Sequence, residues 1–409
     1  MAILKSSGTR SKVSEFKLNT LLEITNAINN NLPEDQLFVL FQYILEHQLG
    51  IGRAVGYLLQ DDTWINMLHY GATEEELLIN VEQDLAHIKD ITVLEMQGDA
   101  ADAANFDVVI PVFNQSKIIA YLLLGDIDEH ERRASPIIKH LPFIQKLANI
   151  TAVAVENKRL VNENIEREKL KQELETASVM QGMLLPRVLP NDSHFQVAAY
   201  YRPHQEVGGD FYDVQLVNDN ELMICLADVS GKGISAAILM ASFQANLRAQ
   251  FAVSSNLETI LHNLNGTVWH NASGERFITV FLAKYNSATR ILEYVNCAHP
   301  APILDQGNEI VRLKDGTVGL GMFDELPFIN KGSVEIAKGT ILTAYTDGVN
   351  ELEAMDGSVF EDEYVADIIK KQQYKTMSEL NMLITSAMMA HKGNLDYSDD
   401  IAIVSCKFF

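Results

Sequence analysis

The sequence has 409 residues, which corresponds to roughly two or three domains of ordinary size. Hydrophobic residues make up 47%, charged residues 21%, and the net charge is −23. This composition excludes disordered and collagen-like proteins, and the acidic surface makes nucleic acid and a bare anionic membrane poor partners. No apolar run approaches the ~18 residues that span a bilayer, and the first residues lack the apolar core of a signal peptide. We therefore expect a cytoplasmic protein without a membrane span.

The first part of the chain alternates helical and strand-like patterns. Residues 18–50 have apolar residues at helical spacing, with a break at 31–35. Strand-like runs follow at 53–60, 64–70, 107–113 and 117–126, and a helical pattern returns from 136 to about 160. Residues 1–17 are expected to form an N-terminal tail.

This order of elements over residues 18–158 resembles the GAF domain, a small sensory α/β fold. The hairpin sequence VVIPVFNQSKIIAYLLLGD at 108–126 carries most of the likeness. The resemblance implies a small-molecule or protein ligand for this domain. The absence of cysteine from the segment excludes a thioether-linked bilin.

Residues 159–189 are expected to form a linker helix, which Pro186 and Pro190 end. Five of its positions follow the four–three spacing of a coiled-coil seam, with two weak members among them: Leu170, Leu174, Ala177, Gln181 and Leu184. The pattern fits a solvated linker or a short parallel coiled coil that joins two protomers. We favour the coiled coil and therefore expect a homodimer.

Residues 190–409 have the pattern of one α+β domain. Helical segments at 234–252, 256–270 and 361–391 separate the strand-like runs. The runs lie at 195–202, 211–217, 221–228, 276–286, 290–297, 340–347 and 400–408.

Aspartates follow or precede several of these runs, at positions 210, 213, 228, 347, 399 and 400. A single aspartate of this kind is a common turn or capping residue. Several carboxylates at the ends of buried strands are costly unless something pairs them, and hard divalent cations prefer oxygen ligands. The set therefore predicts a two-metal centre where the strand ends meet.

Six motifs in this order resemble those of the type 2C metal-dependent protein phosphatases, in the bacterial branch named for the stage II sporulation phosphatase and RsbU. They are VGGDFYD, ADVSGKGISAAILMA, RFITVFLAKYN, YVNCAHPAPIL, YTDGVNE and SDDIAIV. The resemblance implies an α-β-β-α phosphatase sandwich over residues 190–409. It also implies two divalent cations, Mn²⁺ or Mg²⁺, at one end of the sandwich.

The resemblance also implies site residues. Asp228 is expected to bridge both metals, and the Val229 carbonyl to bind one of them. Asp347 and Asp399 are expected to bind the other, and Asp210 to orient the attacking water, so Asp210 and Asp228 are the expected catalytic residues. Asp213 and Asp400 are adjacent candidates with weaker claims.

Two positions depart from the family pattern. Ser230 stands where eukaryotic relatives have a histidine that is a candidate general acid, so water, His204 or His299 would supply the proton for the leaving group. Ala298 stands where relatives often have glycine, which predicts an altered tight turn.

The resemblance implies a signal-regulated phosphatase that hydrolyses phosphoserine or phosphothreonine with a metal-activated water. Its implied substrate is a STAS-type anti-sigma antagonist in a partner-switching pathway. One alternative is a catalytically silent GAF-containing sensor or scaffold that binds a phosphoprotein. Another is a cyclic-nucleotide-binding regulator whose enzyme half is secondary.

Overall fold

The computed structural model describes residues 3–94, 106–125, 140–307, 309–371 and 374–409. The chain divides into two compact units, residues 1–168 and 169–409. Among the described residues, no helix combines the length and the apolar character that a membrane crossing requires.

The N-terminal unit contains one antiparallel sheet in the order β2-β1-β5-β4-β3. Its strands are β1 (Arg53–Gln60), β2 (Thr63–Tyr70), β3 (Thr92–Val93), β4 (Val108–Asn114) and β5 (Lys117–Gly125). Side chains of the central strands are buried on both faces, because Leu58 belongs to one apolar cluster and Tyr57 to another. The sheet therefore has cover on both sides.

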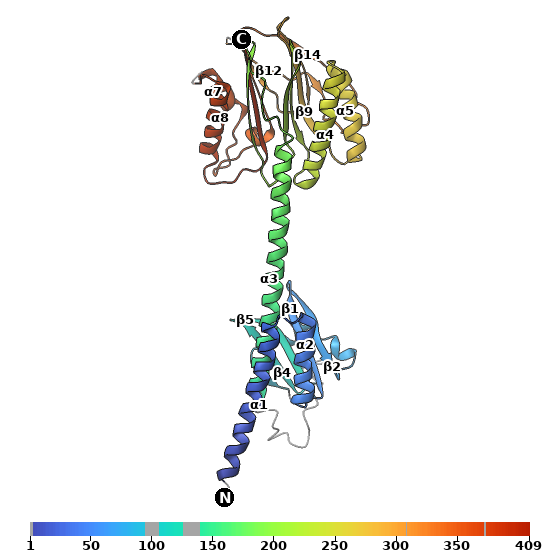
Figure 1. The fold of residues 1–409 in the computed structure, drawn as a ribbon, viewed down its shortest axis with the longest axis vertical. Helices are drawn as coiled ribbons and strands as arrows, with labels where there is room; N and C mark the ends of the chain where they lie inside the picture. Colours follow the sequence, from blue (N-terminus) through green and yellow to red (C-terminus); the bar gives the residue numbers. More distant parts are fainter. Residues whose placement is uncertain (1–2, 95–105, 126–139, 308, 372–373) are drawn as a thin grey trace. The chain divides into compact units, whose positions relative to one another are not determined.

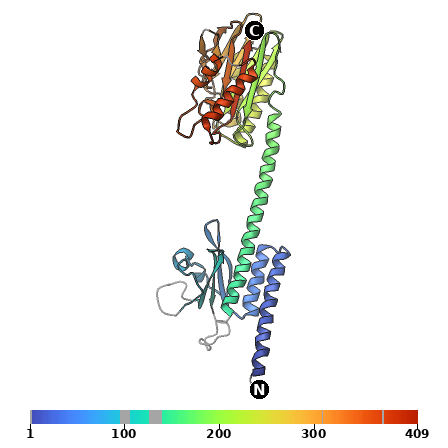
Figure 2. The same cartoon turned by 90° about the vertical axis from the view of Figure 1, so that its left-hand side faces the viewer.

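Helices cover one face of this sheet (Figure 2). They are α1 (Ile3–Asn29), α2 (Glu34–Tyr43), the π-helical turn η1 (Ile44–Gln48) and the first part of α3 (Leu141–Gly182). The other face packs on a cluster that includes residues of the short turns η2 (Glu75–Leu77) and η3 (Val81–Leu85). Helix α1 starts at Ile3, so the segment expected to be a tail is largely helical. Its polar SSGTRSK run has no apolar periodicity, which explains the prediction.

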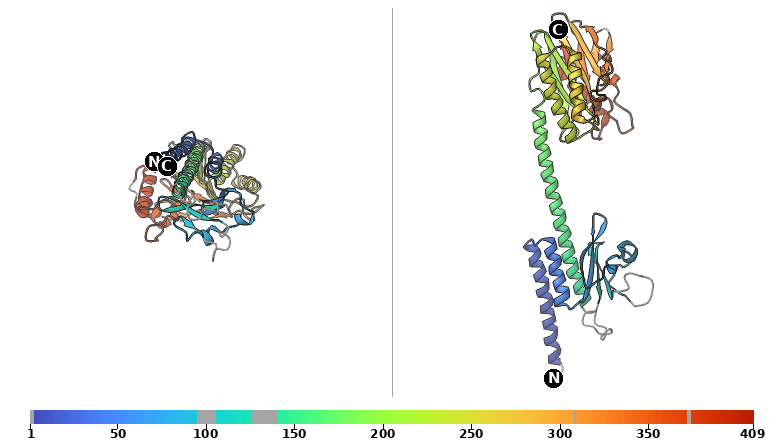
Figure 3. Two further views of the ribbon diagram at one scale, coloured as in Figure 1. Left: turned by 90° about the horizontal axis from the view of Figure 1, so that it is seen from below. Right: turned by 90° about the vertical axis from the view of Figure 1, so that its right-hand side faces the viewer.

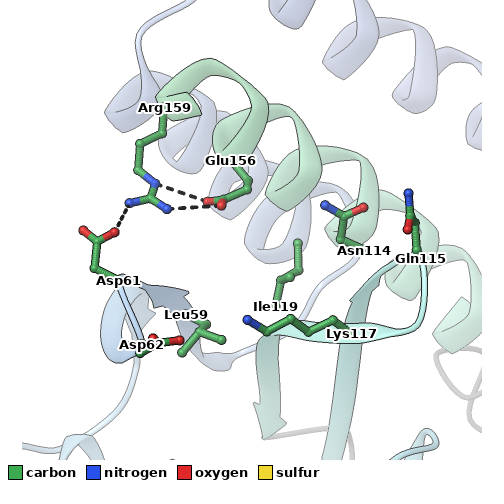
Figure 4. Close-up of a pocket in the computed structure, with 9 residues that line it drawn as sticks. All are labelled: Leu59, Asp61, Asp62, Asn114, Gln115, Lys117, Ile119, Glu156 and Arg159. Carbon is green, nitrogen blue, oxygen red and sulfur yellow. Dashed lines mark hydrogen bonds and ion pairs between the residues drawn. The ribbon is translucent and has the colours of Figure 1, made fainter. Parts of the chain in front are cut away.

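Helix α3 is attached to the turn between β1 and β2 by Arg159 (Figure 4). The guanidinium is 2.8 Å from the Asp61 carboxylate and 3.1 Å from that of Glu156, and it also reaches Glu163 at 3.2 Å. Arg159, Asp61 and Glu156 border a cleft of about 500 Å³ that Lys117 also lines. The helical pattern expected from residue 136 lies partly outside the described residues, and the helix is continuous from Leu141.

The last turns of α3 pack against the C-terminal unit. Gln181 is buried, and Leu184, just beyond the helix, contacts the apolar core of that unit. Leu170, in contrast, is 55% exposed. Gln181 and Leu184 of the expected seam therefore pack inside the C-terminal unit and are not available to a second helix. The coiled coil stays a prediction for the earlier residues of α3.

Two sheets of the C-terminal unit pack face to face, because residues of both share one apolar cluster. The first has the order β13-β10-β9-β8-β7, with β14 also paired to β10, and the second the order β12-β11-β15-β16-β6. The first contains β7 (Phe211–Asn218), β8 (Glu221–Val229), β9 (Ile278–Asn286), β10 (Ile291–Cys297), β13 (Gly316–Thr317) and β14 (Gly332–Glu335). The second contains β6 (Phe195–Arg202), β11 (Ile303–Asp305), β12 (Ile310–Arg312), β15 (Ile341–Tyr345) and β16 (Ile401–Phe408).

Helices flank this pair of sheets (Figures 1 and 3). Helices α4 (Ile234–Val253) and α5 (Leu257–Ala272) lie on the first sheet, and α7 (Asp362–Lys371) and α8 (Met377–Lys392) on the second. The unit is thus layered α-β-β-α. The single helical segment expected at 361–391 is two helices, because α8 has its own N-terminal cap, in which Thr376 accepts a hydrogen bond from the Glu379 amide.

Candidate functional site

The expected site residues lie at corresponding ends of strands from both sheets. Asp210 precedes β7, and Asp228 and Val229 end β8 in the first sheet. In the second sheet, Asp347 follows β15 at the start of the short helix α6 (Asp347–Asn350), and Asp399 and Asp400 precede β16.

The aspartates are close enough for their charges to interact. Burial raises the pKa of Asp228 to about 7, and the carboxylates of Asp347 and Asp399 add to the rise, while a hydrogen bond with Asp210 opposes it. Burial first, and then Asp399, raises the pKa of Asp347 to about 6. These shifts indicate a carboxylate cluster in which the negative charges repel one another.

Asp210 is the most deeply buried member of the cluster, with 1% of its surface exposed. Burial raises its pKa well above the usual range, and the carboxylates of Asp228 and Asp400 add to that effect. Its Oδ2 atom is buried and has no hydrogen-bond partner. A buried carboxylate oxygen without a partner is costly, so this atom is a candidate ligand for a cation or for ordered water.

Asp400 holds the loop that carries Asp210. Its Oδ2 accepts hydrogen bonds from the amides of Gly209 (2.6 Å) and Asp210 (3.3 Å), and its Oδ1 accepts one from the amide of His204 (2.7 Å). Three main-chain donors satisfy this carboxylate. The contacts show that Asp400 positions the loop of Asp210, and its role as a metal ligand stays a prediction.

Close packing explains the glycines of this loop. A Cβ atom on Gly208 would lie 2.5 Å from Asp400 Oδ2, and one on Gly209 would lie 2.9 Å from the carbonyl oxygen of Val229. Only glycine permits these approaches. The close approach to Gly209 also shows that the Val229 carbonyl lies beside the loop that carries Asp210.

Asp399 contacts a cation supplied by the chain. Lys232 Nζ is 2.7 Å from Asp399 Oδ2 and donates a hydrogen bond of 2.6 Å to the carbonyl of Ser398. The Asp399 side chain is 36% exposed, and its other oxygen accepts a hydrogen bond from the Asp400 amide. The Lys232 ammonium also lowers the pKa of Asp347, which partly offsets the rise caused by burial.

The residues present fit a hard divalent cation. The donors are carboxylate and carbonyl oxygens, the carboxylates repel one another, and Asp210 offers a buried oxygen without a partner. Within the ranges that the structure describes, no three His, Cys, Asp or Glu side chains already form a compact ion site. The assignment of metal ligands therefore stays a prediction.

Other residues considered from the sequence lie apart from this cluster or are otherwise engaged. Asp213 is fully buried and pairs with Arg248 at 2.7 Å. The Ser230 hydroxyl accepts a hydrogen bond from the Phe277 amide. His299 is 2.8 Å from Thr279 Oγ1, and burial lowers its pKa to about 3. A histidine with so low a pKa is neutral near pH 7 and is a poor proton donor.

Sequence reasoning missed two functional contacts. Gln181, at the end of α3, donates a hydrogen bond of 2.6 Å to the Gly208 carbonyl and accepts one of 3.0 Å from the Gly208 amide. The sequence holds one hint of this contact: Gln181 is a polar residue at a position where a coiled coil would place an apolar one. The ion pair of Lys232 with Asp399 has no sequence signal, because the two residues are far apart in the chain.

Comparisons with known proteins agree with this geometry. Residues 218–409 match the family described as stage II sporulation protein E. The chain is 25% identical over 331 residues to protein IcfG of Synechocystis, covering 72% of this chain and 51% of that protein. It is 27% identical over 194 residues to phosphoserine phosphatase RsbU of Bacillus subtilis, covering 47% of this chain and 57% of that protein.

Phosphoserine phosphatase RsbP of the same organism is 25% identical over 235 residues, which are 56% of each chain. The chain thus spans about half the length of the curated relatives it matches. The solved SiaA-PP2C domain of Pseudomonas aeruginosa superposes with a TM-score of 0.53 at 21% identity, covering 60% of this chain and 99% of that domain. From the layered sandwich and this match, we conclude that residues 218–409 contain a domain of the stage II sporulation protein E type and that the C-terminal unit has the PP2C fold.

Proposed function

We propose that this protein is a metal-dependent protein serine/threonine phosphatase whose N-terminal unit regulates its C-terminal domain. One observation carries the proposal. Asp210, Asp228, Asp347 and Asp399 come from the strand ends of both sheets at one end of the C-terminal unit, and the raised pKa values of Asp210, Asp228 and Asp347 support mutual repulsion among these carboxylates.

In this proposal Asp228, Asp347, Asp399 and the Val229 carbonyl hold two divalent cations, Mn²⁺ or Mg²⁺. Bound there, the cations would supply the Lewis acidity that activates water and offsets charge on the phosphoryl group. Asp210 orients the attacking water from its buried position. Asp400 keeps the loop of Asp210 in place through its three amide contacts.

The proton for the leaving group comes from solvent in this proposal. His299 is neutral and bound to Thr279, and the side chain of His204 is exposed. The Ser230 hydroxyl is a poor acid and is already bound to the main chain.

The proposed substrate is a phosphorylated STAS-type anti-sigma antagonist in a partner-switching pathway. The family match and the likeness to RsbU and RsbP, which are named phosphoserine phosphatases, support this choice. The N-terminal unit is proposed to be GAF-like and to bind a small molecule or a protein. Two exposed leucines of α3 that fit one four–three frame, Leu160 and Leu170, support the proposal that a second copy of the chain pairs there.

The test is release of phosphate from an aryl phosphate and from a phosphoserine peptide, with and without Mn²⁺. We expect Asp228→Asn and Asp347→Asn to lower turnover by at least a hundredfold, because each removes a charged oxygen ligand. Asp219→Asn is the matched control, since it makes the same chemical change in the exposed turn at the other end of β8. Turnover that is independent of Mn²⁺, or equal in all three variants, would contradict the proposal.

A further inference from the structure

Lys232 occupies a position that bears on how the site binds cations. It lies between Gly231 and Gly233, which both have positive φ angles of 89° and 77°. The loop follows β8, and the Lys232 side chain reaches the segment before β16. The Lys232 side chain is 47% exposed, yet its ammonium contacts Asp399 and the Ser398 carbonyl.

Those contacts place a positive charge on an oxygen that the proposed function assigns to a metal. Lys232 Nζ is 2.7 Å from Asp399 Oδ2, and its positive charge also lowers the pKa of Asp347. Asp399 and Asp347 are the two carboxylates expected to hold the second cation. An ammonium and a divalent cation cannot both occupy the same face of one carboxylate oxygen, and they also repel each other.

We propose that Lys232 is a built-in competitor for the second divalent cation, which must displace the ammonium from Asp399 in order to bind. This inference rests on the proposed function, because it presumes that Asp399 is a metal ligand. In this proposal Lys232 acts through Asp399 and sets the affinity of the site for one of its two cations. The cation of lower affinity then responds to changes of the loop at 231–233.

Titration of the full chain with Mn²⁺ tests the proposal, with free Mn²⁺ measured by electron paramagnetic resonance at fixed ionic strength. We expect Lys232→Met to tighten the weaker of two binding events by about tenfold and to leave the tighter event within twofold. Lys232→Arg keeps the charge, and we expect it to bind Mn²⁺ like the unmodified chain.

Lys331→Met is the matched control. It removes the same charge from an ion pair, with Glu293 at 2.6 Å, in the same unit. Across the sheet, Glu293 is level with Met223 in β8, whereas Asp228 stands at the end of that strand, so the control pair lies away from the candidate site. We expect this variant to bind Mn²⁺ with unchanged affinities.

Unchanged Mn²⁺ affinity in Lys232→Met would overturn the inference, and so would equal tightening in Lys232→Met and Lys331→Met, because that effect would come from net charge. If neither the unmodified chain nor Lys232→Met bound Mn²⁺, the proposed function itself would fail. The failure of the inference and that of the function are therefore distinguishable.

Discussion

The contact between Gln181 and Gly208 predicts that the end of helix α3 stabilises the catalytic loop. Replacing Gln181 by leucine keeps a good helix former of similar size but removes both hydrogen bonds. The amide and carbonyl of Gly208 then stay buried without partners, and each costs about 1–3 kcal/mol. We expect the C-terminal unit to lose about 2–6 kcal/mol of its unfolding free energy. Turnover should fall as well, because Gly208 leads directly into Asp210.

The assay is urea unfolding of the full chain followed by tryptophan fluorescence. The chain has two tryptophans, Trp64 in the N-terminal unit and Trp269 in the C-terminal one. A Trp64→Phe background therefore makes the signal specific for the C-terminal unit. Gln172→Leu is the control, since Gln172 lies on the same helix and its side chain is exposed. If Gln181→Leu cost less than about 0.5 kcal/mol, or no more than Gln172→Leu, the reasoning about buried unsatisfied groups would be refuted.

Three further predictions concern the same unit. Ala298 has a φ angle of 55°, so Ala298→Gly should raise the unfolding free energy by up to about 1 kcal/mol in urea titrations, and a loss would contradict the assigned strain. The folded-state pKa of His299 is depressed to about 3, so its contribution to stability is present above the unfolded pKa near 6.5 and is lost as the pH falls toward 3. His299→Gln should therefore flatten the acid dependence of the unfolding free energy by up to about 1.4 kcal/mol per pH unit, and an unchanged slope between pH 4 and 6 would show that the histidine does not stay neutral in the fold. Asp228→Asn should stabilise the protein in chelator by about 1–3 kcal/mol, measured as a higher Tm by calorimetry, because it removes one repelling charge, and a lower Tm would contradict the repulsion.

Elements with strong apolar patterns could be predicted closely from the sequence. The strands expected at 53–60 and 195–202 are confirmed at both ends, and the helix expected at 234–252 is confirmed to within one residue. Short elements with two to four residues, such as β13 and β14, were missed, because so few residues show no periodicity.

The site could be predicted only in part, for a physical reason. Aspartates at strand ends are visible in the sequence, but what each carboxylate contacts depends on tertiary packing. Asp400 was an adjacent candidate ligand, and packing also gives it three hydrogen bonds from main-chain amides, which the sequence does not reveal. Ala298 was expected to alter a turn, and it adopts the left-handed conformation itself. Gln181 matched a coiled-coil spacing while its partner lay 27 residues further along the chain.

The position of strand β16 has a consequence for biosynthesis. It pairs with β6 on one side and β15 on the other, so the first and last strands of the domain are neighbours in one sheet. The contact between Asp400 and His204 joins residues 196 positions apart. Such pairing slows folding, because a long loop must close before the contacts form. A ribosome must therefore deliver nearly the whole domain before the second sheet can close, whereas the sheet of the N-terminal unit is complete in sequence by Gly125.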